Sequence, residues 1–161
     1  MQYRIGFGFD VHRLDYNLPF ILGGVSIPSV KGMVAHSDGD VLLHALCDAM
    51  LGAVNLGDIG QHFPDTNDEY KNISSLVLLR KTYELIKAKG YSISNIDSTV
   101  VVEKPKIMPH VATMQKTIAH ELGINTDQIS IKATTNEKLG FIGQEEGITA
   151  YAVVLLYKGN Q

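Results

Sequence analysis

Hydrophobic and polar residues alternate with a period of two over residues 3–12. One side of this pattern carries Tyr3, Ile5, Phe7 and Phe9, and the other carries Arg4, Gly6, Gly8, Asp10 and His12. Because successive side chains of a strand point to opposite faces, the pattern predicts a strand with one aromatic face and one face cleared by glycine. Asp10 and His12 both lie at the end of this glycine-cleared face, and both are potential metal ligands.

A helical period follows over about residues 38–55. Asp40, His44 and Asp48 recur every four residues, so they are expected to share one face of this helix. The other face is apolar, with Val41, Leu42, Ala45, Leu46, Ala49, Met50 and Ala53. We expect Ser37 as the N-cap, with Asp40 three residues later at the capping-box position, where the helix dipole favours a carboxylate.

The rest of the chain predicts further helices and strands. One helix begins at Asn72 or Ser74 and is stopped by Gly90, and another has Pro109 in its first turn and ends at Gly123. The expected strands cover residues 96–103, 129–133 and 148–157, and a hairpin-like excursion covers residues 18–27.

The last of these strands is apolar on both faces apart from Thr149. In so small a domain, such a strand is expected to bury its second face against another subunit. Residues 57–67, by contrast, are so rich in Gly, Pro and Asp that we expect an irregular loop. Together the elements predict a single α+β domain over residues 1–161, with a mixed sheet of about four long strands and three main helices packed on it.

The composition narrows the classes of function. The chain has 161 residues, 45% of them hydrophobic, which is enough for one well-filled core. Its net charge is −3 and it has no basic run, so we expect no nucleic-acid partner. We see no signal-peptide pattern and no apolar run near the ~20 residues of a membrane span, so no membrane partner is expected. The single cysteine, Cys47, permits no intrachain disulfide, which favours a reducing, cytoplasmic location.

Asp10, His12 and His44 form the sharpest candidate for chemistry. Two ligands two residues apart on a strand, joined by a third from a helix, predict a tripod with an open fourth position, as in catalytic zinc sites. The same ligand types suit the two-histidine, one-carboxylate site of non-haem iron oxygenases, which is an alternative interpretation. Asp-x-His is also a common tripeptide, so an ordinary hydrogen-bonded pair is a third interpretation.

Other polar residues give weaker signals. His36 precedes the helix and is suited to hydrogen bonding or proton transfer, or is simply a loop histidine. Asp48 lies one turn after His44 and either orients a neighbouring ligand or faces solvent. Glu137 follows a strand, where its carboxylate suits a hard cation such as Mg²⁺. Cys47 falls at the wrong helical angle to share a metal with His44, so we interpret it as a core residue.

Five motifs occur together in a fixed order and spacing. They are Phe9-Asp10-Val11-His12, His36-Ser37-Asp38-Gly39-Asp40-Val41-x-x-His44, Gly57-Asp58-Ile59-Gly60, Phe63-Pro64-Asp65-Thr66 and Lys132-Ala133-Thr134-Thr135-x-Glu137-Lys138-Leu139-Gly140. In these motifs the chain closely resembles the 2-C-methyl-D-erythritol 2,4-cyclodiphosphate synthases of the non-mevalonate isoprenoid pathway, over essentially its whole length.

The resemblance implies a homotrimer with active sites between adjacent subunits. The implied substrate is a cytidine diphosphate derivative, 4-diphosphocytidyl-2-C-methyl-D-erythritol 2-phosphate. Its 2-phosphate attacks the β-phosphorus, which closes the cyclic diphosphate and releases CMP, so the implied enzyme is a phosphorus–oxygen lyase. A non-enzymatic trimeric module that binds a metal or a small molecule is the competing interpretation, and it predicts no turnover.

The resemblance also assigns roles to residues. It implies Zn²⁺ on Asp10, His12 and His44, Mg²⁺ or Mn²⁺ on Glu137, and catalytic positioning of the transferring phosphate by His36 and Thr135. The implied substrate-binding residues are Asp10, His12, His36, Ser37, Asp58, Ile59, Gly60, Phe63, Pro64, Asp65, Thr66 and Asn67. The implied nucleotide-binding residues, from the neighbouring subunit, are Val102, Glu103, Lys104, Pro105, Lys106, Ile107, Met108, Thr134, Thr135, Asn136, Glu137 and Phe141.

Two positions depart from the family pattern. Gln144 stands where many members carry an arginine, and Tyr151 stands where a glutamate often partners that arginine. In relatives these residues line the trimer axis at one end of an apolar cavity that can hold an isoprenoid diphosphate. Without the arginine we expect such a ligand to bind weakly or not at all, and tight binding of geranyl or farnesyl diphosphate in a titration would contradict this.

Overall fold

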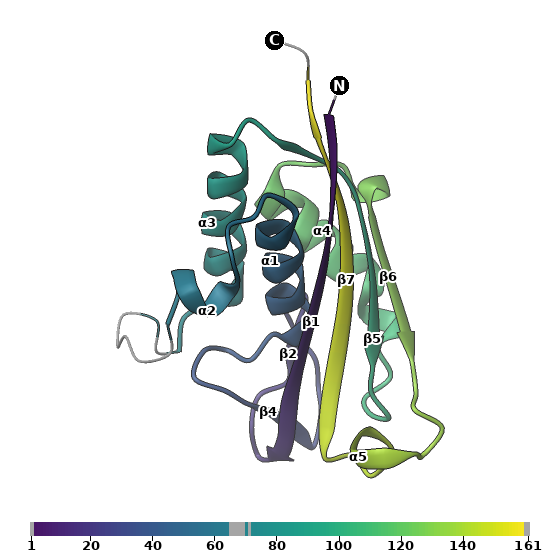
Figure 1. Ribbon diagram of the computed structural model, residues 1–161. Helices are drawn as coiled ribbons and strands as arrows, with labels where there is room; N and C mark the ends of the chain where they lie inside the picture. Colours follow the sequence, from purple (N-terminus) through teal and green to yellow (C-terminus); the bar gives the residue numbers. More distant parts are fainter. Residues whose placement is uncertain (1, 65–69, 71, 160–161) are drawn as a thin grey trace.

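The fold is built on one mixed sheet of five strands, in the computed structural model of residues 2–64, 70 and 72–159 (Figure 1). The strands are β1 (Gln2–Tyr16), β4 (Lys31–Val34), β5 (Ser92–Val101), β6 (Ile129–Thr134) and β7 (Gly147–Lys158). Their order in the sheet is β4-β1-β7-β5-β6. β5 and β6 are parallel, and the other neighbouring pairs are antiparallel. A separate two-stranded ribbon joins β2 (Ile21–Leu22) to β3 (Val25–Ser26), as the expected hairpin-like excursion.

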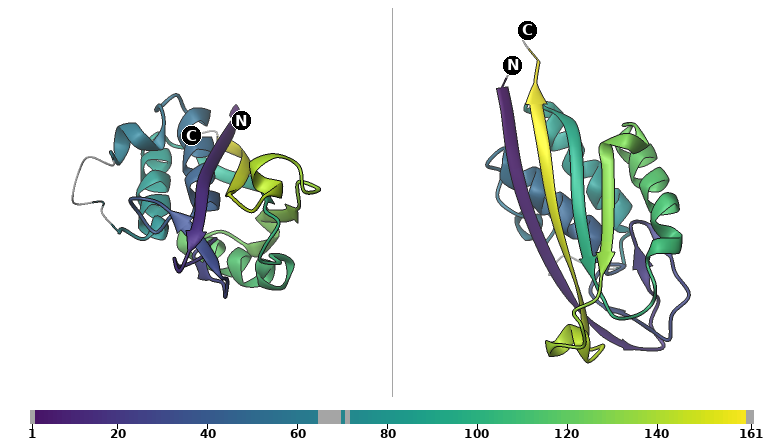
Figure 2. Two further views of the ribbon diagram at one scale, coloured as in Figure 1. Left: turned by 90° about the horizontal axis from the view of Figure 1, so that it is seen from below. Right: turned by 90° about the vertical axis from the view of Figure 1, so that its right-hand side faces the viewer.

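Three long helices cover one face of the sheet, and the other face is left bare (Figures 1 and 2). They are α1 (Val41–Ala53), α3 (Ser75–Ala88) and α4 (Val111–Leu122). Two short helices, α2 (Ile59–His62) and α5 (Gly140–Gly143), lie in connections, as do the 3₁₀ turns Met108–His110 and Thr126–Gln128. No helix in the described part of the chain is both long and apolar enough to cross a membrane.

The two glycines of β1 let α1 approach the sheet very closely. A Cβ added to Gly6 would lie 1.8 Å from the carbonyl oxygen of Ala49, and one added to Gly8 would lie 1.9 Å from that of Ala45. Real Cβ atoms essentially never come so close, so only glycine fits this contact. The predicted glycine-cleared face is therefore the face that packs on α1, and the close approach brings the end of β1 beside His44.

The aromatic face of β1 is exposed to solvent in the single chain. The large hydrophobic side chains on this side of β1 and β7 are Tyr3, Ile5, Phe7, Phe9, Val11, Tyr151 and Val153. The opposite face of β7 is fully covered, with Ile148, Ala150, Ala152, Val154 and Leu156 in the core. On the second face of the last strand Thr149 is buried, but Tyr151 and Val153 are exposed within one chain.

Several element boundaries differ from those expected. The sheet has five strands rather than four, because the short edge strand β4 was not predicted. Residues 57–67 are not entirely irregular, since Asp58 caps the short helix α2. β5 begins earlier than expected, at Ser92, and the Gly-rich segment after Glu137 contains α5.

The starts and ends of the helices follow local capping chemistry. Asp40, not Ser37, is the N-cap of α1, and its carboxylate accepts a hydrogen bond from the backbone N–H of Leu43. Ser74 is the N-cap of α3, as one of the two expected possibilities. α4 begins at Val111, after a 3₁₀ turn that contains Pro109, and ends at Gly123 in the left-handed conformation.

Candidate metal centre and adjoining pocket

Asp10 and His12 of β1 and His44 of α1 come together as a compact triangle of ligand atoms. Nδ1 of His44 lies 3.0 Å from Oδ2 of Asp10 and 3.1 Å from Nε2 of His12, and the third side, from Nε2 of His12 to Oδ2 of Asp10, is 3.3 Å. Two ligands at zinc-like distances from one tetrahedral ion are separated by about 3.3 Å. The three residues therefore fit a single metal ion and leave a fourth position open.

The electrostatic environment of this triangle favours a positive charge. Burial acts to lower the pKa of His44, but the hydrogen bond and charge of Asp10, with the charges of Asp40 and Asp38, outweigh it and raise this pKa. The pKa of His12 is instead lowered, chiefly by burial, against the opposing effect of Asp10. A divalent cation with two neutral histidines would satisfy the carboxylate that both rings face.

His44 is held from its far side as well. Its Nε2 lies 2.9 Å from Oγ of Ser75 and 3.2 Å from Oγ of Ser37. The Ser75 hydroxyl in turn donates a hydrogen bond to the carboxylate of Asp38. Each ring nitrogen of His44 thus has its own set of partners, with the ligand triangle on the Nδ1 side.

A cavity of about 480 Å³ opens beside the triangle. Its lining residues are His12, Ala35, His36, Ser37, His44, Ile59, Gly60, Phe63, Pro64, Tyr70, Ile73 and Leu78. Nε2 of His36 is buried here and has no hydrogen-bond partner among the described residues. A buried nitrogen without a partner is costly, so His36 is a candidate to hydrogen bond to a polar group bound in this cavity.

The short helix α2 forms one wall of the cavity and is held by two aspartates. Asp58 caps α2 by accepting hydrogen bonds from the backbone N–H and the side-chain amide of Gln61. Asp48 of α1 accepts a hydrogen bond of 2.8 Å from the backbone N–H of Ile59. Asp48 therefore fixes the wall of the cavity, which is neither of the two roles expected from the sequence.

Most of the substrate-binding candidates meet at this cavity. Ile59, Gly60, Phe63 and Pro64 line it together with His12, His36 and Ser37, whereas Asp58 is exposed and is not among the lining residues. Asp65, Thr66 and Asn67 lie outside the described residues. Phe63 packs edge-on against Tyr70, with ring centroids 5.6 Å apart, so the two rings make an apolar end to the cavity.

The nucleotide-binding candidates gather at a different, smaller cavity of about 200 Å³. It is lined by Val102, Glu103, Pro105, Lys106, Ile107, Met108, Ala133, Thr134 and Thr135. None of these residues lines the cavity beside the metal triangle. Lys104 is largely exposed and pairs with Glu145. Within one chain, Thr135 and His36 therefore belong to separate cavities.

The loop that carries Glu137 has an unusual backbone. Glu137 and the next residue, Lys138, both adopt positive φ angles, 52° and 63°. One carboxylate oxygen of Glu103 accepts hydrogen bonds from the backbone N–H groups of Asn136 and Lys138, and this oxygen holds the turn. The carboxylate of Glu137 is exposed and accepts a hydrogen bond from the Thr135 hydroxyl. Glu137 is therefore available to a cation but is separate from the triangle.

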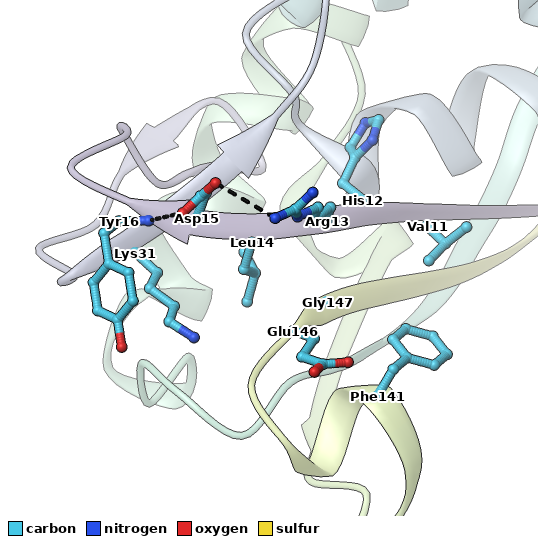
Figure 3. A pocket seen from close by; sticks show the side chains of 10 residues that line it. All are labelled: Val11, His12, Arg13, Leu14, Asp15, Tyr16, Lys31, Phe141, Glu146 and Gly147. Atoms are coloured by element: carbon cyan, nitrogen blue, oxygen red, sulfur yellow. Dashed lines mark hydrogen bonds and ion pairs between the residues drawn. The ribbon is translucent and has the colours of Figure 1, made fainter.

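A third cavity, of about 570 Å³, lies between the end of β1 and α5 (Figure 3). Phe141 lines it, together with Glu146, Gly147 and Lys31, so Phe141 is not part of the cavity of the other nucleotide-binding candidates. His12 points to the opposite side of β1 from Val11 in this view. Gln144 follows the last residue of α5. Tyr151 packs against Phe9 in a tilted arrangement, with ring centroids 5.2 Å apart, on the exposed face of the sheet.

Several residues of the site were not expected. Asp38 occurs in a quoted motif but had no assigned role, and Ser75 is the neighbour of the expected cap Ser74. Tyr70, Ile73 and Leu78 line the cavity although nothing in their spacing marks them. The residues that give the clearest sequence signal have a regular spacing on one element. Asp38, Tyr70 and Ile73 instead lie in connecting segments, and Ser75 and Leu78 lie on α3.

Known proteins resemble this chain along almost its whole length. A protein-family model described as the YgbB family matches residues 3–157. A 2-C-methyl-D-erythritol 2,4-cyclodiphosphate synthase of Bacteroides fragilis is 58% identical over 156 residues, covering 97% of this chain and 98% of the relative.

Solved structures agree with this similarity. The bifunctional IspDF of Campylobacter jejuni is 45% identical with a TM-score of 0.95, over 99% of this chain and 43% of that longer chain. A 2C-methyl-D-erythritol-2,4-cyclodiphosphate synthase solved in a form with CDP bound is 38% identical with a TM-score of 0.89, over 96% of this chain and 100% of that one.

Proposed function

This chain belongs to the YgbB family, and we propose that it closes a cyclic diphosphate at the centre formed by Asp10, His12 and His44. Its activity is that of its curated relatives, 2-C-methyl-D-erythritol 2,4-cyclodiphosphate synthesis, a lyase reaction of isoprenoid biosynthesis. The observation that carries the location is a three-ligand triangle beside a cavity lined by His36, whose buried Nε2 has no hydrogen-bond partner among the described residues.

The reaction needs positioning and charge neutralisation more than a protein nucleophile. The 2-phosphate of the substrate forms a bond to the β-phosphorus, the bond from that phosphorus to the oxygen bridging to the α-phosphate breaks, and CMP departs with this oxygen. Phosphoryl transfers of this kind are accelerated chiefly by holding the groups in line and by neutralising their charge. A chain with a net charge of −3 achieves this with local groups rather than with overall charge.

Asp10, His12 and His44 would hold a zinc ion, and Glu137 would hold Mg²⁺ or Mn²⁺. When bound, such ions neutralise phosphate oxygens and act as Lewis acids. The donor set supports zinc at the triangle, because two imidazoles and one carboxylate are typical zinc ligands, and the exposed Glu137 carboxylate supports a hard cation.

The other residues of the cavity would bind and orient the substrate. His36 would bind a phosphate oxygen through Nε2, which gives this buried nitrogen its partner. The backbone of Ile59 and Gly60, fixed by Asp48, would hold the methylerythritol part. The rings of Phe63 and Tyr70 would exclude water from this end, which protects the reacting phosphate from hydrolysis.

We infer that the complete active site needs two subunits of a homotrimer. Thr135 and the cytidine candidates line a cavity separate from the metal triangle within one chain, so a neighbouring subunit is needed to bring them to the substrate. The exposed apolar side of β1 and β7 supports such an assembly, because an apolar surface of this kind is typical of an interface. The comparisons give no support to the iron-oxygenase alternative, since the relatives are named as synthases.

The His36→Ala variant separates the enzyme from a binding module. We expect this variant to retain wild-type zinc content, because His36 is not in the ligand triangle, but to release CMP at least about 100-fold more slowly. The measurement is CMP release by chromatography together with metal analysis of the same samples. His62→Ala is the matched control, because His62 hydrogen bonds to the carbonyl of Leu56 and lies outside the cavity lining. Absence of CMP release by the wild type would contradict the proposed activity, and unchanged CMP release by His36→Ala would contradict the role of His36.

A further inference from the structure

The carboxylate of Asp38 makes two contacts with the first residue of α3. Its Oδ2 accepts a hydrogen bond of 2.8 Å from the backbone N–H of Ser75, and its Oδ1 accepts a hydrogen bond from the Ser75 hydroxyl group. Ser75 is fully buried, whereas Asp38 is half-buried. Oδ1 also accepts a hydrogen bond of 3.2 Å from the backbone N–H of Asp40, which fixes the carboxylate itself.

These contacts determine which way the hydrogen bonds to His44 run. An ionised carboxylate only accepts, so the Ser75 hydroxyl must donate to Asp38, and its oxygen is left to accept. Nε2 of His44 lies 2.9 Å from that oxygen and is therefore the donor. A proton on Nε2 leaves the lone pair on Nδ1, the atom that faces Asp10 and His12.

We propose that Asp38, acting through Ser75, is a positioning residue that fixes the tautomer and orientation of His44 so that Nδ1 is free to bind a metal. This rests on the metal-binding role proposed above for His44, but not on the identity of the substrate. Partners of this kind behind a ligating histidine commonly change metal affinity by 10- to 100-fold when they are removed.

Two backbone hydrogen bonds also connect the segment of Asp38 to the wall of the substrate cavity. Asp38 donates its backbone N–H to the carbonyl of Ile73 at 3.1 Å, and the carbonyl of His36 accepts a hydrogen bond of 2.8 Å from the backbone N–H of Asn72. The segment that carries His36 is thus joined to the start of α3 on both sides of Ser37. Asp38 is placed to keep the metal ligand and His36 in a fixed relation.

The test compares zinc affinity among single and double variants of this chain. Asp38→Asn puts an amide group where only acceptors fit, and Ser75→Ala removes the nearer of the two hydroxyl oxygens beside Nε2 of His44, leaving Ser37 at 3.2 Å. We expect each to weaken zinc binding 10- to 100-fold. The double variant should bind zinc no more weakly than the single variant with the lower zinc affinity, because both changes break the same chain of hydrogen bonds. Zinc dissociation constants are measured by competition with a chromophoric chelator, with thermal melting of the same samples.

Ser74→Ala is the matched control for damage to the helix start. The Ser74 hydroxyl caps α3 through the backbone N–H of Leu76, and among the hydrogen bonds of the described residues it has none to His44. We expect its zinc affinity to stay within twofold of wild type although its melting temperature falls. A loss of affinity in Ser74→Ala as large as in Ser75→Ala would overturn the proposal, because destabilised α3 would then explain both.

Two further outcomes keep the tests distinct. Unchanged zinc affinity in folded Ser75→Ala overturns the role of Asp38 while leaving the metal centre intact. Failure of the wild-type chain to bind zinc, with His44→Ala no different from it, overturns the metal centre and this inference together. If the variants fail to fold, nitrogen-15 NMR of the zinc-loaded wild type decides, since we expect the His44 ring proton on Nε2, and a proton on Nδ1 would contradict the proposal.

Discussion

Asp40 illustrates how one buried side chain can set the start of the central helix. It is fully buried, caps α1 through the backbone N–H of Leu43, and accepts a second hydrogen bond of 2.7 Å from the backbone N–H of Gly24. Burial raises the pKa of Asp40 to about 6, even though these hydrogen bonds favour the ionised form. The carboxyl group therefore binds a proton more readily in the folded chain than in the unfolded one.

This raised pKa predicts a specific dependence of stability on pH. Between the ordinary pKa of 3.8 and the folded value of about 6, the folded state binds more protons, so the contribution of Asp40 to the free energy of unfolding falls as the pH rises. One pKa unit corresponds to about 1.4 kcal/mol, so the fall over this window is about 3 kcal/mol. Urea unfolding of metal-free wild type and Asp40→Asn at several pH values measures it. As the pH rises through this window, the unfolding free energy of the wild type should fall relative to that of Asp40→Asn. A difference that does not change with pH would contradict the raised pKa of Asp40.

At the scale of residues, the sequence marked the proposed ligands better than the side chains that hold them. Asp10 and His12 are two apart on one strand, and His44 repeats a helical spacing with Asp48, so simple periodicity marks them. Asp38 and Ser75 meet only because α3 packs beside α1, and no local pattern records that contact. Asp40 was expected to share a face with His44, but as N-cap it turns toward Gly24 instead.

At the scale of elements, the contact between β1 and α1 positions the site. Gly8→Ala would place a Cβ against the backbone carbonyl of Ala45. Because this carbonyl belongs to the packed helix α1, the helix or the strand β1 must shift to make room. We expect a loss of about 3 kcal/mol or more in the free energy of unfolding, measured by urea denaturation. Gly52→Ala is the matched control: Gly52 lies in α1 with nothing within 4 Å of an added Cβ, so alanine should stabilise by up to about 1 kcal/mol. Equal effects of the two changes would contradict this account of the contact.

Long elements with a regular period could be predicted, whereas short ones could not. The alternation of β1 and the helical spacing of α1, α3 and α4 extend over many residues, and capping residues such as Ser74 and Gly123 mark their ends. β4 covers four residues at an edge of the sheet, too few for a period to show. α2 also covers four residues, and its start depends on the side chains of Asp58 and Asp48 rather than on any pattern within it.

At the scale of the whole molecule, the exposed apolar side of β1 and β7 predicts an assembly. Phe7 lies on this surface and is 63% exposed in the single chain, so Phe7→Lys should leave the fold of the chain intact while placing charges in the proposed trimer interface. We expect sedimentation velocity to show a trimer for wild type and mainly monomer for Phe7→Lys, with zinc bound by both but CMP released only by wild type. Val30→Lys is the control, since Val30 is 75% exposed but lies outside the strands of this surface. An active monomer of Phe7→Lys would contradict the shared active site.

The central claim, that a metal centre at Asp10, His12 and His44 closes a cyclic diphosphate, is tested most directly by phosphorus NMR. Purified protein is mixed with 4-diphosphocytidyl-2-C-methyl-D-erythritol 2-phosphate, with and without chelator, and the phosphorus signals are followed in time. We predict that signals of the cyclic diphosphate and of CMP appear together, disappear with chelator, and return on addition of Zn²⁺ and Mg²⁺. Unchanged substrate signals with a folded, zinc-loaded trimer would contradict the claim.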